Sequence, residues 1–317
     1  MKMKLILKKI KKALINPKLV LIVLLSNEFV ARLFPDWLYL KIKFYLAMDK
    51  KLNLKNPQTF NEKLQWLKLY DRNPKYTKMV DKYEVRKYIA ETIGEEYLIP
   101  LIGIWDSPDE IDFNSLPNQF VLKCTHNSGL GMCICKDKSK LDIKKVKRDL
   151  KKGLSQNYFL SGREWPYKNV KPRIIAEKFM RNSFETISED GLIDYKFYCF
   201  NGRPEYAYVS QNLDNHKKAR ISYVTLDWKQ APFKRNDYKS FEELPQRPKN
   251  FNKMLELAKV LSNKIPFLRV DFYEIDRKIY FGELTFFPGG GFTKLHPEEG
   301  DFNLGDLIDL KEKFCLK

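Results

Sequence analysis

Cysteine is scarce in this chain of 317 residues, and its positions are irregular. The five cysteines are Cys124, Cys133, Cys135, Cys199 and Cys315, and no two of them form a Cys-x-x-Cys pair. An odd number without such pairs argues against a disulfide framework and against a zinc site. Cys133 and Cys135, two apart in an apolar run, are expected on one face of a strand as small hydrophobic residues. This cysteine usage indicates a protein of the reducing cytoplasm.

Long hydrophobic runs are missing as well. The apolar run of residues 19–25 is far too short to span a bilayer. Pro17 and Lys18 precede it and no small-residue cleavage site follows, so it resembles a signal peptide only superficially. The sequence therefore predicts neither a membrane-spanning helix nor a cleaved leader.

Acidic residues are outnumbered by basic ones. The chain has 58 Lys and Arg against 40 Asp and Glu, a formal net charge of +18. Residues 1–70 hold 15 of the basic residues against 4 acidic ones, so +11 of the +18 lies there. An excess of basic residues suits anionic partners such as nucleotides, anionic lipids or acidic sugars. It is equally explained by a protein that uses lysine as its ordinary surface residue. Zinc-finger spacing, an RNP-type strand and a helix-turn-helix pattern are absent, so nucleic acid is not expected as a partner.

The first part of the chain, residues 1–55, is predicted to be a basic, amphipathic helical segment. It carries seven lysines within residues 1–18, and further lysines alternate with Trp37, Tyr39 and Tyr45. A segment of this kind can lie on the inner face of an anionic membrane or bind an anionic glycan. It can equally pack on the body of the protein, and the sequence leaves both possibilities open.

The rest of the chain mixes helices with antiparallel strands, which indicates an α+β fold. Thr59 and Glu62 form a capping box, and apolar residues at helical spacing behind it predict a helix over 60–70. A second helix is predicted over about 80–92, and a third over 251–264. Strands are predicted at 97–104, 119–125, 132–135 and 173–180. A charged helical segment is predicted at 141–154. Two hairpins are predicted at 192–209 and 268–285. The first hairpin is expected to turn at Asn201-Gly202.

A lysine and a small-residue loop follow the predicted strand at 119–125. The strand delivers Lys123, and Ser128, Gly129 and Gly131 lie in the loop behind it. Small residues let backbone N–H groups approach phosphate oxygens, while a lysine supplies a point charge. No Gly-Lys-Ser/Thr opens a helix, so this is not a Walker A motif. Taken alone, the loop is as often an ordinary hairpin turn.

A second constellation lies near the end of the chain. Asp271 and Glu283 are expected on adjacent strands, with Thr285 on the same face as Glu283 and Arg269 on the same face as Asp271. Oxygen ligands on a rigid strand pair suit Mg²⁺, and an arginine beside them suits a phosphoryl group. The glycines that follow, including Gly289 and Gly290, could offer N–H donors to a developing oxyanion. Edge-strand carboxylates paired with surface lysines would explain the acids but not three glycines after a proline.

These motifs occur in the order found in ATP-grasp enzymes. Their amino-acid sequences resemble those of the TupA-like ATP-grasp proteins, which belong to bacterial surface-polysaccharide gene clusters. The resemblance covers roughly residues 50–310, and its motifs lie at 56–66, 80–86, 120–123, 174–180, 194–202 and 269–289. It implies an ATP-grasp fold of two α+β lobes that clasp ATP between antiparallel sheets. On this basis residues 56–118 are a preceding helical lobe, 119–180 the small lobe and 181–317 the large lobe with the metal site.

The resemblance also implies a role for each matching residue. Lys123, Arg86 and Lys196 would contact the phosphates of ATP, with the loop of Ser128, Gly129 and Gly131 folded over them. Glu177, Lys178 and Met180 would belong to the hinge that pairs with adenine through main-chain groups. Asp271, Glu283 and Thr285 would hold Mg²⁺, although the family usually has asparagine where this chain has Thr285. Arg269 would stabilise the phosphoryl group in transfer, and Gly289 and Gly290 would complete the catalytic set.

The predicted function is an ATP-dependent carboxylate–amine or carboxylate–thiol ligase that acts through an acyl phosphate. The resemblance suggests a sugar acid or an amino acid as substrate and a capsular or other surface polysaccharide as destination. The alternative is a glycosyltransferase that uses a nucleotide sugar, but the chain has no Asp-x-Asp motif. A membrane-associated scaffold would leave Arg269, Asp271 and Glu283 without a purpose. The expected location is the cytoplasm, with peripheral attachment to the inner face of the cell membrane as an open possibility.

Overall fold

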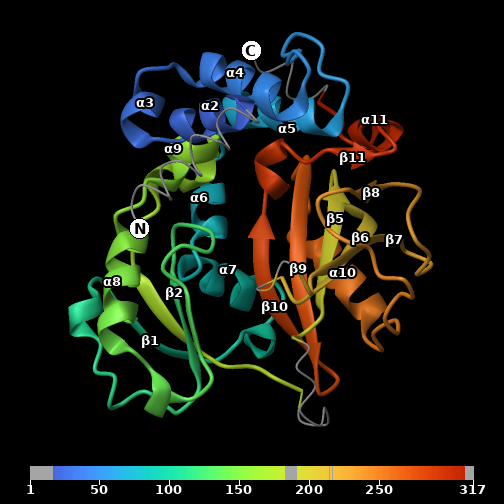
Figure 1. Ribbon diagram of the computed structural model, residues 1–317. Helices are drawn as coiled ribbons and strands as arrows, with labels where there is room; N and C mark the ends of the chain where they lie inside the picture. The colour runs from blue at the N-terminus through green and yellow to red at the C-terminus, as the bar shows by residue number, and fades with distance from the viewer. Residues whose placement is uncertain (1–16, 183–190, 214, 216, 311–317) are drawn as a thin grey trace.

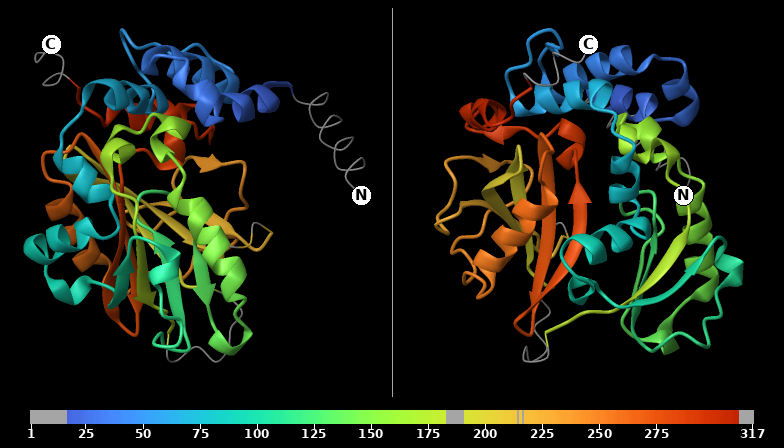
Figure 2. Two further views of the ribbon diagram at one scale, coloured as in Figure 1. Left: turned by 90° about the vertical axis from the view of Figure 1, so that its left-hand side faces the viewer. Right: turned by 180° about the vertical axis from the view of Figure 1, so that it is seen from behind.

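The computed structural model describes residues 17–182, 191–213, 215 and 217–310. Figure 1 shows a layer of helices at the top, a small sheet at the lower left and a larger sheet at the right. Two short helices, α6 and α7, descend between the two sheets, and the view from behind in Figure 2 shows the same arrangement. No helix in the described ranges has the length and apolar character needed to cross a membrane.

The top layer is built from N-terminal helices. These are α2 (Pro17–Leu25), α3 (Glu28–Arg32), α4 (Asp36–Met48) and α5 (Phe60–Tyr70), joined by α9 (Tyr158–Gly162) from later in the chain. The predicted helix over 60–70 is confirmed, with its capping box: Thr59 Oγ1 accepts from the Glu62 N–H at 3.2 Å, and Glu62 Oε2 accepts from the Thr59 N–H at 3.2 Å. α4 buries one side against α9, so the described part of the N-terminal segment packs on the body of the protein.

The second predicted helix, over about 80–92, is α7 (Glu84–Thr92), which ends where predicted and begins four residues later. A helix that was not predicted, α6 (Lys75–Val80), precedes it, and Asp81 separates the two. Its Oδ1 accepts from the N–H groups of Tyr83 and Glu84, and its Oδ2 pairs with Arg173 at 2.8 Å. An aspartate that accepts N–H groups two and three residues ahead starts a new helix and does not continue the old one.

The small sheet has four antiparallel strands in the order β1-β4-β2-β3. They are β1 (Leu101–Trp105), β2 (Phe120–Cys124), β3 (Cys133–Cys135) and β4 (Ile174–Lys178), with α8 (Ile143–Leu154) packed on one face. β1 begins four residues later than the predicted strand, because Tyr97 ends the 3-10 helix η1 (Glu95–Tyr97) and residues 98–100 form no regular element. The sheet takes in β1, which comes before residue 119. Cys135 is buried and Cys133 half-buried, and both are free thiols.

The large sheet has five antiparallel strands in the order β10-β9-β5-β6-β7. They are β5 (Asp194–Phe200), β6 (Arg203–Gln211), β7 (Arg220–Thr225), β9 (Phe267–Ile275) and β10 (Lys278–Thr285). Both predicted hairpins are confirmed: Asn201 and Gly202 turn the first with φ of 48° and 80°, and Asp276 and Arg277 turn the second with φ of 51° and 64°. Sequence patterning did not identify β7.

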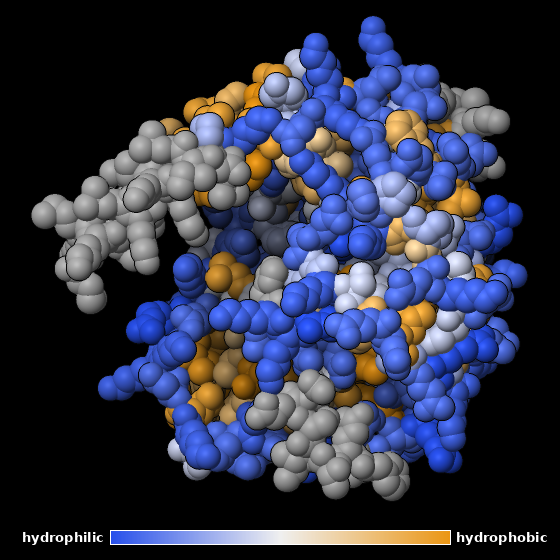
Figure 3. All heavy atoms as spheres, turned by 45° about the vertical axis from the view of Figure 1, so that its right-hand side comes forward, coloured by the Kyte–Doolittle hydropathy of each residue, from blue (hydrophilic) through white to orange (hydrophobic). Residues whose placement is uncertain are grey.

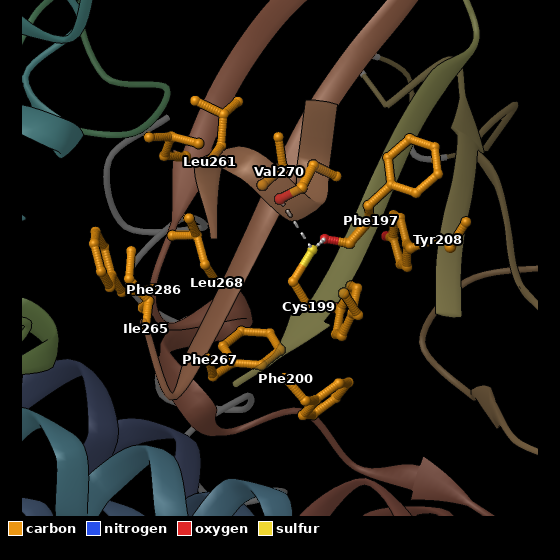
Figure 4. Close-up of a cluster of buried hydrophobic side chains, with 14 of the residues drawn as sticks. Phe197, Cys199, Phe200, Tyr208, Leu261, Ile265, Phe267, Leu268, Val270 and Phe286 are labelled. Atoms are coloured by element: carbon orange, nitrogen blue, oxygen red, sulfur yellow. Dashed lines mark hydrogen bonds between the residues drawn. The ribbon is translucent and has the colours of Figure 1, made fainter. Parts of the chain in front are cut away.

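Helix α10 (Phe251–Leu261) covers the large sheet and ends three residues before its predicted end. Figure 4 shows the packing beneath it, where Cys199 lies among aromatic and aliphatic side chains and its thiol points to the carbonyl oxygens of Phe197 and Ala258. Four short elements complete the chain: the 3-10 helix η5 (Pro288–Gly291), the two-stranded pair β8 (Lys234–Arg235) and β11 (Leu295–His296), and α11 (Glu299–Asp306).

Candidate active site

The charged side chains of the large sheet converge on Asp271. This residue is 1% exposed and lies on β9 directly opposite Lys196 of β5, whose Nζ donates to Asp271 Oδ2 at 2.8 Å. Arg269, two residues earlier on the same strand face, donates through Nε and a terminal nitrogen to the two carboxylate oxygens, both at 2.7 Å. Burial raises the pKa of Asp271 against the opposing charges of Arg269 and Lys196. The arrangement is a fully hydrogen-bonded buried carboxylate.

Glu283 joins this group from β10. Arg269 donates to Glu283 Oε1 at 2.5 Å, and Thr285 donates its hydroxyl to the same oxygen at 3.1 Å. A register shift between Phe281 and Leu284 sets Glu283 beside the arginine. Burial alone would raise the pKa of Glu283, but Arg269, Lys196 and Lys82 hold it at about 2. Glu283 is therefore a permanently charged carboxylate at neutral pH.

The donor set of Asp271, Glu283 and Thr285 fits a magnesium ion. Both described hydrogen bonds to the Glu283 carboxylate reach Oε1, so Oε2 is left for another partner. Within the described ranges there is no cluster of three or more His, Cys, Asp or Glu side chains placed to hold a metal. Two carboxylates and a hydroxyl are nevertheless hard oxygen donors, and Mg²⁺ commonly takes one or two protein carboxylates together with substrate phosphates.

On the small sheet, Lys123 and Arg86 share one carboxylate. Lys123 Nζ donates to Glu177 Oε2 at 2.7 Å, and Arg86, from α7, donates to Glu177 Oε1 at 3.5 Å. The structure thus brings together three residues that the sequence analysis assigned to ATP. The side chain of Glu177 holds the two cations in place, a role that its expected place in the hinge did not suggest.

Lys82 is a cation of this site that the sequence analysis did not select. It is half-buried, and its ammonium donates to the Asn127 carbonyl of the glycine loop, while its main-chain N–H donates to the Thr125 carbonyl at 3.2 Å. Burial lowers its pKa, and the charge of Glu283 opposes that effect. Its position next to Asp81 in the motif at 80–86 was the available signal. Lys82 therefore links the glycine loop to the carboxylates of the large sheet.

The two glycines of the loop differ in their surroundings. Gly129 has a φ of +80°, and a β-carbon built on it would meet no atom within 4 Å, so this residue faces open space. Gly131 has a φ of +73°, and its β-carbon would lie 2.8 Å from Cys124 Sγ and 3.0 Å from the Gly153 α-carbon. Gly131 is thus required for packing against α8, whereas Gly129 and the exposed Ser128 are free to approach a ligand.

The hinge residues lie at the other end of β4 from the glycine loop, because Lys178 pairs with Phe120 while Ile174 pairs with Cys124. The N–H of Lys178 donates to the Pro100 carbonyl at 3.0 Å. Lys178 also lines an open cavity of about 640 Å³ with Pro100, Gln119 and Phe179. Met180 follows as a half-buried residue.

The glycines of η5 are fixed by α5. Gly289, Gly290 and Gly291 have φ of 58°, 64° and 66°. Lys68 donates to the Gly290 carbonyl at 2.6 Å, and Gln65 donates to the Gly291 carbonyl at 2.7 Å. The N–H of Gly290 donates to the Phe287 carbonyl at 2.8 Å, so the tight turn itself uses the donor that was expected to face an oxyanion.

The chain was compared with curated proteins, solved structures and protein families. No curated protein matches the chain. The structure resembles D-alanine–D-alanine ligase from Helicobacter pylori, with 15% identity and a TM-score of 0.42 over 80% of this chain and 70% of that one. It resembles the Bacillus anthracis D-alanine–D-alanine ligase in complex with ATP with 16% identity and a TM-score of 0.43, over 75% and 67%. For phosphoribosylamine–glycine ligase from Thermotoga maritima the values are 13% and 0.37, over 66% and 48%.

The family assignment covers most of the chain. The model of the TupA-like ATP-grasp family matches residues 62–309, the region that contains both sheets and all of the predicted site residues. The predicted ATP-grasp fold and the predicted enzyme class are thereby confirmed. The chain belongs to the TupA-like ATP-grasp family and is an ATP-dependent ligase.

Proposed function

We propose that this enzyme joins a carboxylate to an amine through an acyl phosphate. A carboxylate oxygen of the first substrate attacks the γ-phosphorus of ATP, the bond to the bridging oxygen breaks, and ADP leaves. The amine then attacks the carbonyl carbon of the acyl phosphate, and inorganic phosphate leaves as the C–N bond forms. The protein contributes positioning and electrostatic stabilisation, which supply most of the rate in phosphoryl transfer.

The observation that carries this proposal is the placement of fixed positive charge around two buried carboxylates. Arg269 and Lys196 are both locked by Asp271, so neither has to reorganise when charge develops on a transferring phosphoryl group. Lys123 and Arg86 are held by Glu177 in the same manner on the small sheet. Cations held by neighbouring carboxylates are presented in a fixed geometry to the anion that binds between the sheets.

Magnesium belongs to the proposal through Asp271, Glu283 and Thr285. When bound there, Mg²⁺ would neutralise charge on the nucleotide phosphates. The oxygen Oε2 of Glu283, free of described hydrogen bonds, is the first ligand that we assign to it. The hydroxyl of Thr285 is a weaker donor than the asparagine amide that the family usually has there.

The substrate and its destination rest on the resemblance to proteins of surface-polysaccharide clusters. We propose a sugar acid or an amino acid as the carboxylate, and a surface polysaccharide or its precursor as the destination. Exposed apolar side chains on and beside α2–α4 support a peripheral position on the membrane or on an anionic glycan, because α2 and α4 also carry Lys18, Lys41 and Lys43: Leu21, Val23, Phe29, Leu33 and Trp37. Figure 3 shows this hydrophobic surface at the top of the molecule. Such a combination is typical of interfacial helices.

The test compares nucleotides by thermal shift and then follows turnover. ATP with Mg²⁺ should raise the melting temperature, and a UDP-sugar with Mg²⁺ should not. ADP release should depend on an added carboxylate, and Glu283→Ala should abolish it. Stabilisation by a UDP-sugar alone would support the glycosyltransferase alternative, and full turnover by Glu283→Ala would refute the metal assignment.

A further inference from the structure

Glu164 is a buried carboxylate without a hydrogen-bond partner. It lies between α9 and the 3-10 helix η4 (Trp165–Asn169), and it is 5% exposed. In the described part of the chain, no hydrogen bond or ion pair reaches its side-chain oxygens, and these oxygens are not among the fully enclosed polar atoms without a partner, so they keep contact with solvent. Burial raises its pKa to about 7, against the charges of Lys68 and Lys43. Buried carboxylates are normally paired or hydrogen-bonded, so this group calls for an explanation.

The neighbouring cations are committed to other acceptors. The three donor positions of Lys68 are used by Gln65 Oε1 at 2.9 Å, the Gly162 carbonyl at 2.8 Å and the Gly290 carbonyl at 2.6 Å. Lys43 donates to the Ser161 carbonyl. These lysines oppose the charge of Glu164 electrostatically, but neither of them donates a hydrogen bond to its carboxylate oxygens.

Glu164 faces the catalytic loop. A β-carbon built on Gly290 would lie 3.8 Å from Glu164 Oε1, and one built on Gly162 would lie 3.0 Å from it. The charge of Glu283 also raises the pKa of Glu164, and the charge of Arg269 lowers it. Glu164 is therefore close to η5 and within electrostatic range of two residues proposed to act at the phosphoryl group.

Two tyrosines complete the surroundings. Tyr158 and Tyr167 stack edge to face with ring centroids 4.7 Å apart. The charge of Glu164 is the first cause that raises the pKa of Tyr158, and a hydrogen bond from the Ser128 side chain of the glycine loop acts against this rise. The tyrosines thus span the distance between Glu164 and the loop over the nucleotide. Aromatic faces beside a carboxylate form an environment suited to a cation.

We propose that Glu164 is the binding group for a primary ammonium on a substrate of this ligase, in a subsite bounded by Tyr158, Tyr167 and Gly290. The inference rests on the proposed ligase function and adds the charge of a substrate to it. An ammonium would supply charge-assisted hydrogen bonds to a carboxylate that has no such partner in the described part of the chain. The ammonium can belong to the attacking amine or to the α-amino group of an amino acid that serves as carboxylate, and the two sources are separable by experiment.

The experiment measures binding to the full chain loaded with Mg²⁺ and ADP, by calorimetry. The probes are ethanolamine against ethylene glycol, and glycine against glycolate, so that each pair differs in the ammonium. The wild type should prefer the ammonium member of at least one pair by about tenfold or more, and Glu164→Gln should lose that preference. Preference for ethanolamine identifies the attacking amine, whereas preference for glycine alone identifies an amino-acid carboxylate.

Three results separate the possible failures. The thermal shift with ATP and Mg²⁺ in the wild type tests the ligase function itself, and it should persist in Glu164→Gln. If that shift is present but neither ammonium is preferred, or the preference survives in Glu164→Gln, the subsite is refuted. If Glu164 serves only as a counter-charge for Lys68, Glu164→Gln should lower the melting temperature by several degrees, whereas the exposed control Glu256→Gln should not. Unchanged or increased stability of Glu164→Gln, together with lost preference, supports the proposal.

Discussion

Lys196 and Asp271 face each other across β5 and β9 and are joined by a hydrogen bond of 2.8 Å. Lys196 is 7% exposed and Asp271 is 1% exposed, so both charges are withdrawn from water. Burial lowers the pKa of Lys196, but Asp271 and Asp194 more than reverse this and raise it. The pair therefore favours the charged form of Lys196 in the candidate active site and ties the stability of the fold to residues proposed to act in catalysis.

Lys196→Met should therefore destabilise the protein. A buried charge left without any partner costs about 3–5 kcal/mol, but Arg269 still pairs with Asp271, so we expect about 2–3 kcal/mol. Urea unfolding would measure the loss. Lys253→Ala removes an exposed pair with Glu256 and should change the unfolding free energy by less than about 0.5 kcal/mol. Equal effects of the two substitutions would contradict the importance of the buried pair.

Arg269→Lys should impair turnover more than ATP binding. The guanidinium contacts both oxygens of Asp271 and also Glu283, a pattern that one ammonium cannot reproduce. We expect kcat for ADP formation to fall by about 100-fold or more, while the KM for ATP changes little. A variant with normal kcat and a raised KM would show that Arg269 only binds the nucleotide.

The glycines of η5 and of the nucleotide loop should respond differently to alanine. At Gly291 the new β-carbon would lie 2.3 Å from Gln65 Nε2 and would also force a φ of 66° on alanine. Gly291→Ala should cost about 2–4 kcal/mol through strain and loss of the α5 contact. Gly129→Ala meets open space and should cost only about 1 kcal/mol for its positive φ. Thermal unfolding of both variants would test this order.

Stability should depend on pH through Glu164. Burial raises its folded-state pKa from about 4.5 to about 7, so between these values the folded protein binds more protons than the unfolded chain. Its contribution to stability is then lost progressively as pH rises from about 4.5 to about 7. The charged and titratable groups around it are Lys68, Lys43, Arg269, Glu283, Tyr158 and Tyr167.

Glu164→Gln should flatten that part of the pH profile. We expect the variant to gain on the order of 1–3 kcal/mol relative to the wild type between pH 5 and pH 8. Urea unfolding at both values would measure the difference. Parallel profiles of the two proteins would show that Glu164 titrates alike in the folded and unfolded states.

The sequence was sufficient wherever structure is decided locally. The capping box of Thr59 and Glu62 and the turn at Asn201-Gly202 are encoded within a few residues, and both form as predicted. The start of α7 was placed four residues too early, although Asp81, which accepts the N–H groups of Tyr83 and Glu84, is itself a local signal for a helix start. The strand β7 was missed because its residues are selected by pairing with β6 and not by a strong pattern of their own.

The same distinction holds for the site. Arg269, Asp271 and Glu283 lie on one predicted hairpin, so their proximity followed from strand geometry. Lys82 gains its interest from the segments around it, and its place beside Asp81 in the motif at 80–86 was the only local signal. Glu164 looks like an ordinary charged residue in the sequence, and its burial depends on distant segments.

The contacts of Lys68 and Gln65 with the η5 carbonyls have a consequence for dissecting the protein. Helix α5 precedes both sheets in the chain, yet two of its side chains bind the carbonyls of η5 more than 200 residues later. A shortened chain that begins at the first strand of the small sheet would retain Lys123, Lys196 and the carboxylates of the large sheet, but η5 would lose these two contacts. We therefore expect that a truncated protein has to include α5 to keep the candidate site intact.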